Sequence, residues 1–203
     1  MPKKILLVSA TQAELPRMHH EDVESLVTGV GMVTTAYSLT RKLSEVKYDF
    51  VIDLGIAGSF NSSFGIGSVV QVVSDRIVEL GVEDNGRFIP ADEMNLVRTE
   101  DVCFQTSIRV NSLPEVRGIT VNRVHGSVDS IESVVSQFNP DIESMEGAAV
   151  AYVCKQFDIP WVQIRGISNL VEPRKRDAWD IPMAIQNLHS EVLKYIDSLR
   201  DEA

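Results

Sequence analysis

The sequence predicts an α/β fold in which a mixed central β-sheet is flanked by helices. Three observations support this prediction. Largely apolar segments that indicate buried strands occur at residues 5–8, 50–54 and 161–167, and the first of them is continuously apolar, as expected for a strand buried on both faces. Segments with apolar residues at helical intervals alternate with them, at 32–43 and 147–157. The composition, with 44% hydrophobic and 24% charged residues, is that of an ordinary globular protein.

The first half of the chain supplies a strand–helix–strand unit. The apolar run at 5–8 is expected to open the sheet, and the run at 50–54 to form a second buried strand. Between them, the apolar spacing predicts a helix over 32–43. This order of elements indicates a parallel α/β core. A further strand is predicted at 69–73.

The segment 79–102 is the least regular part of the sequence. Glycine and proline residues interrupt it, and the pair Asn85-Gly86 is a common turn signal. We interpret it as a long loop with room for a hairpin, and long loops in compact domains often bind ligands. After this loop, a strand is predicted at 119–124 and a short helix at 130–138.

The second half of the chain continues with a helix, a strand and a last helix. An amphipathic helix is predicted at 147–157 and a central strand at 161–167. Pro182 lies near the start of the last helix, which reaches Leu199 and has Asp180 as a candidate N-cap. This helix should pack on the sheet. Because no repeat or linker divides the sequence, we expect a single domain over residues 1–203.

Charge and cysteine content exclude several classes of partner and site. The sequence has 19 Lys and Arg against 29 Asp and Glu, so at a net charge of −10 it would repel nucleic acids and anionic membranes. Cys103 and Cys154 form neither a disulfide framework nor a zinc-binding spacing, which fits a reducing, cytoplasmic compartment. The apolar run at 5–8 is too short for an export signal. His19 and His20 are adjacent and share no helical face, so we expect exposed polar residues rather than a metal site.

Three polar side chains follow predicted strands. Glu14 comes shortly after the first strand, Glu146 lies where a strand-like segment enters a helix, and Asn169 closes the strand at 161–167. In open α/β sheets the carboxyl ends of the strands form the ligand crevice. Each residue alone has a simpler explanation, since acidic residues are common on surfaces and are favoured in a first helical turn. Together they predict a polar site at one edge of the sheet.

Five segments, in this order along the chain, resemble the purine nucleoside phosphorylase and nucleosidase superfamily. The most specific is Met145-Glu146-Gly147-Ala148-Ala149, and the resemblance covers nearly the whole chain. It implies a nucleoside phosphorylase-like three-layer fold and catalysis without a metal or an organic cofactor. The five segments are residues 28–33, 53–59, 65–70, 145–149 and 165–169.

Within this superfamily the sequence is similar to the methylthioadenosine/S-adenosylhomocysteine nucleosidases. The short chain, the segment 79–83, and Asn169 in place of the usual Asp look closer to the futalosine hydrolases. That resemblance implies hydrolysis of futalosine to hypoxanthine and dehypoxanthine futalosine, a step of menaquinone biosynthesis. It also implies a homodimer or higher homo-oligomer, for which the apolar segment 60–66 is available.

The resemblance assigns roles to the acidic residues. Glu146 matches the residue whose carboxylate accepts hydrogen bonds from the ribose hydroxyls, and Met145 would pack against the ribose. Glu14 matches the residue that binds and polarises the attacking water. Cleavage of a purine N-glycosidic bond requires such groups, because positive charge develops on the sugar and negative charge on the base.

Asn169 bears on the identity of the base. A neutral amide offers one acceptor and a donor group, so its oxygen can receive N7–H while its NH₂ group donates to a 6-oxo group. Adenine would instead place two NH₂ donors against each other, at a cost of about 1 to 3 kcal/mol for a buried unpaired donor. Hypoxanthine is therefore the expected base. The alternative is that Asn169 merely caps a turn.

Further residues are candidates for the substrate pocket. By the resemblance these are Ala57, Gly58 and Ser168, with His125 as part of the wall beside the base. The aromatic residue that stacks on the base in the nucleosidases has no obvious equivalent, and Phe88 is one candidate. A benzoate on the substrate would need a cation, for which the sequence offers Arg87, Arg174, Lys175 and Arg176.

Other functions stay open from the sequence. A phosphorylase would need cationic groups around phosphate, whereas Glu14 would repel it and Arg17 would have to compensate. Water is therefore the expected nucleophile. A methylthioadenosine nucleosidase, a purine nucleoside phosphorylase, and a nucleoside-binding module without catalysis are the alternatives.

Overall fold

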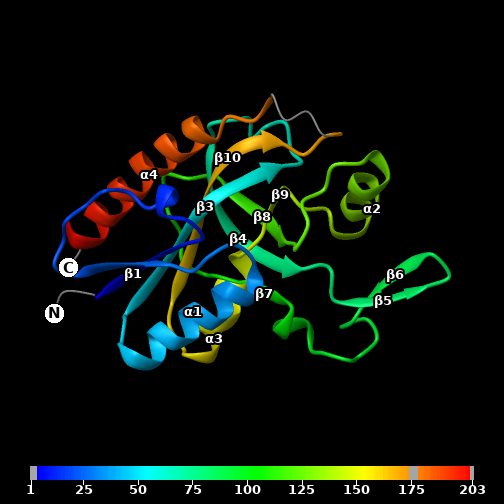
Figure 1. Ribbon diagram of the computed structural model, residues 1–203, viewed down its shortest axis with the longest axis horizontal. Coiled ribbons are helices and arrows are strands. Elements are labelled where there is room, and N and C mark those ends of the chain that lie inside the picture. The colour runs from blue at the N-terminus through cyan, green and yellow to red at the C-terminus, as the bar shows by residue number, and fades with distance from the viewer. Residues whose placement is uncertain (1–3, 174–177, 202–203) are drawn as a thin grey trace.

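A mixed β-sheet organises the computed structural model, which describes residues 4–173 and 178–201 (Figure 1). The strand order is β10-β4-β8-β9-β3-β1-β2, and β7 pairs with β4 beside this path. This confirms the predicted α/β fold with a mixed sheet. The strands are β1 Ile5–Ser9, β2 Val23–Val27, β3 Phe50–Ser59, β4 Val69–Ile77, β7 Cys103–Gln105, β8 Glu115–Thr120, β9 Ile142–Ser144 and β10 Trp161–Leu170.

Five of these strands close into a ring. β10 pairs in parallel with β3 and antiparallel with β4, while β9 pairs in parallel with β8 and antiparallel with β3. Because β4 and β8 are also parallel neighbours, the path β3-β10-β4-β8-β9 returns to β3. β1 and β2 extend the sheet beyond β3. β3 therefore has β1 on one side and β10 on the other, although these two strands are distant in sequence.

Helices cover both faces of the sheet. α4 (Ile181–Asp201) lies on one side, and α1 (Met32–Glu45) and α3 (Gly147–Gln156) lie together on the other (Figure 1). In β1, Ile5 and Leu7 belong to the core with α4, whereas Leu6 and Val8 belong to the core with α1 and α3. A strand buried on both faces needs apolar residues at every position, as the sequence shows.

Most predicted elements are confirmed, and several are longer than predicted. The helices predicted at 32–43, 130–138 and 147–157 correspond to α1, α2 (Val128–Phe138) and α3. The last helix begins as expected, since Asp180 Oδ1 accepts the backbone N–H of Met183 at 2.9 Å. No helix in the described ranges combines the length and apolar character needed to cross a membrane.

The strand predicted at 119–124 is placed wrongly. β8 spans Glu115–Thr120 and pairs with β4 over its whole length. Val121 and Val124 follow the strand and pack instead in a small core beneath α2. Their apolar character comes from that packing, whereas the first half of the strand carries charged residues and therefore lacks an apolar run.

The sequence analysis missed β2 and β7, and it indicated β9 only as a strand-like segment before Glu146, without bounds. The irregular segment does contain a hairpin, formed by β5 (Gly81–Asp84) and β6 (Arg87–Pro90). Asn85 and Gly86 have φ angles of 49° and 78°, the positive values that a two-residue hairpin turn requires. A 3₁₀ turn, η2 (Thr99–Asp101), follows.

A buried polar network fixes the start of α3. The hydroxyl of Thr120 donates to Asp75 Oδ1 at 2.9 Å and accepts the backbone N–H of Ala148 at 2.8 Å. Gln163 Nε2 donates to the other oxygen of Asp75 at 2.9 Å. A Cβ on Gly147 would lie 2.2 Å from Asp75 Oδ2, so only glycine fits where the helix crosses this network. Thr120 thus caps α3 from a neighbouring strand.

We predict that Thr120→Val lowers the free energy of unfolding by about 2–4 kcal/mol, because it leaves two buried groups without a hydrogen bond. Urea denaturation followed by circular dichroism measures this change. Thr120→Ser keeps the hydroxyl and should lose much less. Equal losses in the two variants would show that the hydroxyl bridge does not stabilise α3.

Asp75 should also make stability depend on pH. Burial, the main cause, raises its pKa from 3.8 to about 6. The folded state therefore holds this proton more tightly than the unfolded state, so its stabilising contribution is largest at low pH and is lost as pH rises towards and through 6. We predict that Asp75→Asn gains up to about 3 kcal/mol relative to the wild type between pH 4 and pH 7. Urea denaturation of both proteins at pH 4 and pH 7 tests this. The same difference in stability between variant and wild type at the two pH values would contradict the prediction.

Candidate functional site

An ion pair between neighbouring strands lies at the centre of the site. Arg165 on β10 donates from Nη2 to Asp53 Oδ2 at 2.6 Å and from Nη1 to Oδ1 at 3.2 Å. Both side chains are only 2% exposed. Buried charges of this kind persist only when paired, and the two-point contact fixes the plane of the guanidinium. Its Nε has no hydrogen-bond partner within the described part of the chain.

Glu14 enters the site from the 3₁₀ turn η1 (Gln12–Glu14), directly after β1. Its Oε2 accepts hydrogen bonds from the backbone N–H and the hydroxyl of Thr11, at 2.9 and 2.7 Å. Its Oε1 accepts the backbone N–H of Ile56 at 3.2 Å. Nε2 of His189, on α4, lies 2.9 Å from the backbone oxygen of Glu14, and since a carbonyl only accepts, Nε2 carries the proton. Three hydrogen bonds therefore hold the buried carboxylate, and His189 holds the backbone of the same residue.

Glu146 occupies the N-cap position of α3, but its side chain does not cap that helix. Instead, Oε1 accepts the backbone N–H of Gly31 at 2.8 Å, at the start of α1. Gly31 has a φ of 95°, a conformation that favours glycine and turns this N–H toward the carboxylate. Burial raises the pKa of Glu146 above its ordinary value, and the Gly31 N–H and the charge of Arg165 partly oppose this rise.

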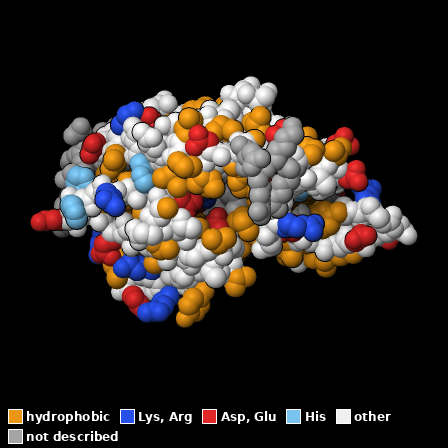
Figure 2. Space-filling model, turned by 45° about the horizontal axis from the view of Figure 1, so that its top comes forward, with side chains coloured by type: hydrophobic (Ala, Val, Ile, Leu, Met, Phe, Trp, Pro, Cys, Tyr) orange, Lys and Arg blue, Asp and Glu red, His pale blue; other side chains and the backbone are white. Residues whose placement is uncertain are grey.

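The acidic side chains surround one guanidinium. A Cβ on Gly55 would lie 3.1 Å from Glu14 Oε1 and 3.2 Å from Arg165 Nη1, so both groups border the same small space. Glu146 interacts electrostatically with Arg165, Asp53 and Glu14. Figure 2 shows a hollow near the middle of one face, with acidic side chains at its bottom and hydrophobic ones along its rim. Three carboxyl groups around one cation favour a ligand that carries or develops positive charge.

Asn169 lies further along the same edge. The register of β10 against β3 shifts at Ser168, and this bulge places Asn169 opposite Gly58. Asn169 Oδ1 accepts the hydroxyl of Ser168 at 2.8 Å, and Nδ2 donates to the backbone oxygen of Leu170 at 3.0 Å. The Ser168 hydroxyl also lies 3.3 Å from the backbone oxygen of Ala57. These contacts fix the orientation of an amide that is only 8% exposed.

His125 borders the same region through an acidic partner. Glu143, on β9, accepts the backbone N–H of His125 at 3.0 Å, and its Oε2 lies 2.5 Å from Nδ1 of the ring. Glu143 pairs with Gly58, the residue opposite Asn169. A small cavity of about 30 Å³ lies here, lined by Val124, His125, Gly126, Asn169, Leu170, Glu172, Ala178 and Trp179.

The two groups of residues lie three positions apart along β3. Arg165 pairs with Gly55 and Asn169 with Gly58 on β3. Three residues along a strand correspond to about 10 Å, roughly the distance from the far side of a ribose to the far edge of its base. The structure thus places Glu14, Glu146 and Asn169 along one edge, with Met145 between β9 and α3 beside Glu146.

Some candidates lie elsewhere or lie outside the described residues. Phe88 packs over Gly81 in the β5–β6 hairpin and does not line the cavity beside Asn169. Arg87 lies in the same hairpin, next to a different groove. Residues 174–176, the other candidate cations, are outside the described residues. Sequence reasoning missed Trp179, an aromatic residue that lines the cavity beside Asn169. Its position ten residues after Asn169 in the sequence could have indicated it.

Sequence reasoning also missed the roles of Asp53 and Arg165. Both appear in the motifs that carry the resemblance, and a charged residue inside an otherwise apolar strand was the available signal. Among the described residues, no group of three or more His, Cys, Asp or Glu side chains could hold a metal ion. The positive charge between the acidic side chains is that of Arg165.

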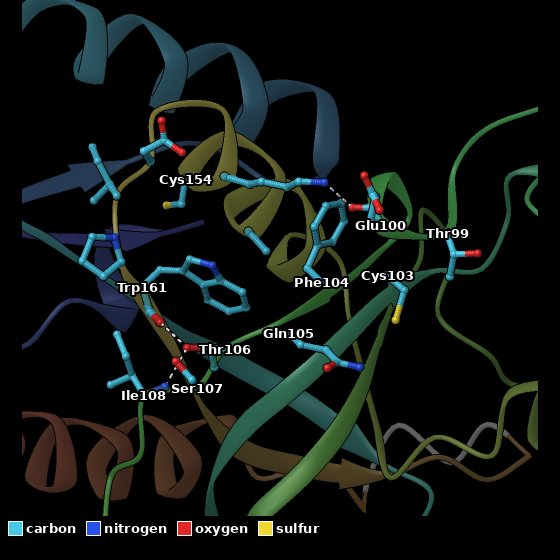
Figure 3. A pocket seen from close by; sticks show the side chains of 15 residues that line it. Thr99, Glu100, Cys103, Phe104, Gln105, Thr106, Ser107, Ile108, Cys154 and Trp161 are labelled. Atoms are coloured by element: carbon cyan, nitrogen blue, oxygen red, sulfur yellow. Dashed lines mark hydrogen bonds between the residues drawn. The ribbon is translucent and has the colours of Figure 1, made fainter.

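A separate cavity lies at the opposite end of β10. It measures about 820 Å³ and opens between the segment around β7 and the end of α3. Figure 3 shows Trp161 and Phe104 at its centre, with Cys103 and Cys154 on its walls. Trp161 begins β10 and Asn169 lies near its end, about 26 Å away along the strand. This cavity is therefore separate from the carboxylates.

Comparison with known proteins agrees with this geometry. The family model described as the Phosphorylase superfamily matches residues 13–197. A futalosine hydrolase from Acidothermus cellulolyticus is 29% identical over 84% of this chain and 73% of its own length. A 5′-methylthioadenosine/S-adenosylhomocysteine nucleosidase from Marinomonas sp. is 31% identical over 76% of this chain and 71% of its own length.

A solved structure shows the same fold. The 5′-methylthioadenosine/S-adenosylhomocysteine nucleosidase from Colwellia psychrerythraea, in complex with adenine, superposes with a TM-score of 0.80 at 18% identity. The superposition covers 98% of this chain and 96% of that one. The relatives act on N-glycosidic bonds by hydrolysis, and the chain is an N-glycosyl hydrolase of the same kind. Together with the match over residues 13–197, this establishes that the chain belongs to the phosphorylase superfamily, as one of its nucleosidases.

Proposed function

We propose that this enzyme hydrolyses the N-glycosidic bond of a 6-oxopurine nucleoside, and that its substrate is futalosine, cleaved to hypoxanthine and dehypoxanthine futalosine. One observation carries the proposal. The buried carboxylate of Glu14, the half-buried carboxylate of Glu146 and the neutral, oriented amide of Asn169 lie along one sheet edge, at about the spacing of a ribose and its base. The futalosine hydrolase relative, similar over 84% of this chain, supports the choice of substrate.

The acidic cluster would act on the sugar. Glu146 would accept hydrogen bonds from the ribose hydroxyls with the oxygen that Gly31 leaves free, and Met145 would pack on the ribose. As the glycosidic bond breaks, positive charge develops on the ribose. Three carboxyl groups around Arg165 stabilise that charge more than they stabilise the neutral substrate, which is the condition for lowering the barrier.

Glu14 would hold the attacking water. Its hydrogen bonds with Thr11 and Ile56 fix both carboxylate oxygens, so the group can accept a proton from water in one orientation. General-base catalysis of this kind contributes about 10² to 10⁴ in rate. Arg165 Nη1, which borders the same space, is positioned to orient the water by hydrogen bonding.

Asn169 would recognise the base. Its amide is oriented by Ser168 and Leu170, which leaves one N–H and part of the oxygen available for the ligand. The remaining N–H would donate to O6 of hypoxanthine, a bond that the amino group of adenine could not accept. Ala57, Gly58 and His125 would form the walls around the base, and Trp179 is a better candidate for the stacking residue than Phe88 because it lines this cavity.

Water is a better nucleophile than phosphate at this site. The arginine nearest to the reaction centre is already paired with Asp53, and Glu14 and Glu146 would repel a phosphate dianion. Arg17 is exposed, outside the group of buried residues. We propose a cytoplasmic homodimer by analogy with the family. Methylthioadenosine/S-adenosylhomocysteine hydrolysis is the second candidate, favoured by the relative at 31% identity.

The proposal is tested by supplying futalosine, inosine and methylthioadenosine to the purified protein, with and without phosphate, and measuring the free base. We expect hypoxanthine from futalosine, at a rate that does not depend on phosphate. Release of adenine from methylthioadenosine as the dominant reaction would refute the role of Asn169. Phosphate dependence would indicate phosphorolysis, and tight binding without turnover would indicate a binding module.

Glu14→Gln should lower kcat by at least about 10²-fold and change the binding of a substrate analogue little, because the amide cannot accept the proton from water. Glu93→Gln makes the same chemical change at an exposed position and should leave the rate unchanged. Steady-state kinetics and calorimetric titration measure the two effects. A Glu14→Gln variant with normal kcat would remove this residue from the mechanism.

A further inference from the structure

The proposed reaction leaves one proton without a source in the described site. Hypoxanthine leaves a nucleoside more easily when N7 receives a proton as the bond to the sugar breaks. A carboxylic acid at position 169 could supply that proton, but the amide of Asn169 can only hydrogen-bond to it. Glu14 takes up a proton from water and cannot also donate one in the same step.

His125 is the titratable group best placed beside this amide. It lines the same small cavity as Asn169. A Cβ on Gly58 would lie 3.1 Å from Asn169 Nδ2 and 3.6 Å from Glu143 Cγ, so the amide and the acid that holds His125 flank one point of β3. Asn169, on β10, and His125, in the loop before α2, therefore line one pocket from two sides.

Glu143 fixes the imidazole ring. The carboxylate is 2% exposed and lies 2.5 Å from Nδ1, while it also accepts the backbone N–H of the same histidine. The ring of Phe60 packs edge-on against it at 6.0 Å between centroids. With Nδ1 turned to Glu143, Nε2 is the nitrogen left for a ligand, and no hydrogen bond to it occurs among residues 4–173 and 178–201.

We propose that His125, held by Glu143, is a catalytic residue that donates a proton from Nε2 to N7 of the departing base, while Asn169 orients that base. The inference rests on the proposed hydrolysis of a 6-oxopurine nucleoside.

The step balances as follows. The bond between N9 and the anomeric carbon breaks, and its electron pair stays on the purine, while N7 takes the proton from His125 Nε2. Water forms the new bond to the anomeric carbon and loses a proton to Glu14. Hypoxanthine leaves as a neutral base, and the proton on Glu14 returns to His125 through solvent, which regenerates both groups.

The surroundings of His125 are acidic. Glu143, on β9, bonds the ring, and Glu172, which follows β10, lines the same cavity. A reaction that needs a proton from His125 should have a basic limb in its pH–rate profile, and this limb should disappear where no proton is needed.

The test compares futalosine with its N7-methyl derivative, whose base is already cationic and leaves without a proton. For His125→Gln we expect a loss of about 10²- to 10³-fold in kcat on futalosine and less than a 10-fold loss on the N7-methyl substrate. His19→Gln, an exposed histidine, is the matched control and should change neither rate. The wild type should show the basic limb with futalosine and lack it with the N7-methyl substrate, a readout that needs no variant to fold.

The outcomes separate the two proposals. No release of hypoxanthine by the wild type would overturn the proposed function, and this inference with it. If the wild type cleaves futalosine while His125→Gln keeps the same rate and pH profile, this inference alone is wrong. Equal losses on both substrates, together with the same basic limb for both in the wild type, would show that His125 supports the fold of the pocket and donates no proton.

Discussion

The arrangement of the site depends on the buried ion pair between Arg165 and Asp53. Two buried charges cost several kcal/mol each unless their geometry compensates, and here two short contacts hold the guanidinium flat between neighbouring strands. The pair is close to neutral, so it adds little net charge, yet the guanidinium also interacts with Glu146 and borders Glu14. The charge of Arg165 opposes the rise that burial causes in the pKa of Glu146. Arg165 thus favours the charged form of a carboxylate beside it.

Neighbouring elements supply structural contacts that would otherwise occupy the functional side chains. Glu146 stands at the N-cap of α3, where a polar side chain ordinarily bonds its own helix, but Thr120 supplies that bond from β8. The carboxylate of Glu146 can therefore extend to Gly31 and the space in front of it. A bulge in β10 has a similar effect on Asn169, since the extra residue re-aims the strand at its end. Functional groups in this fold are positioned by residues from other elements.

Local patterns were enough to predict most of the fold, and they failed where pairing decides the structure. β1, β3 and β10 are buried on both faces, so each has a largely apolar sequence that can be recognised locally. α1 and α4 are buried along one side, so their apolar residues recur at helical spacing. β2, β7 and β9 are short, and their existence depends on a neighbouring strand that lies far away in sequence. The same limit applies to the site. Glu14, Glu146 and Asn169 were found by their place after strands and by motif, whereas the Arg165–Asp53 and His125–Glu143 pairs join residues 112 and 18 positions apart.

Electrostatics also explain why a neutral amide suits position 169 in this chain. The sugar end already gathers Asp53, Glu14 and Glu146 around a single guanidinium, and the base end contains the buried Glu143. Glu143 contacts His125, and no Lys or Arg occurs among the described residues that line the pocket. An aspartate at 169 would be one more buried carboxyl group without a partner, and its charged form would be disfavoured. An amide has nearly the same shape without that charge, and it replaces one acceptor oxygen with an NH₂ donor. Recognition of the base and supply of its proton can then be carried by two different residues, each held by its own neighbours.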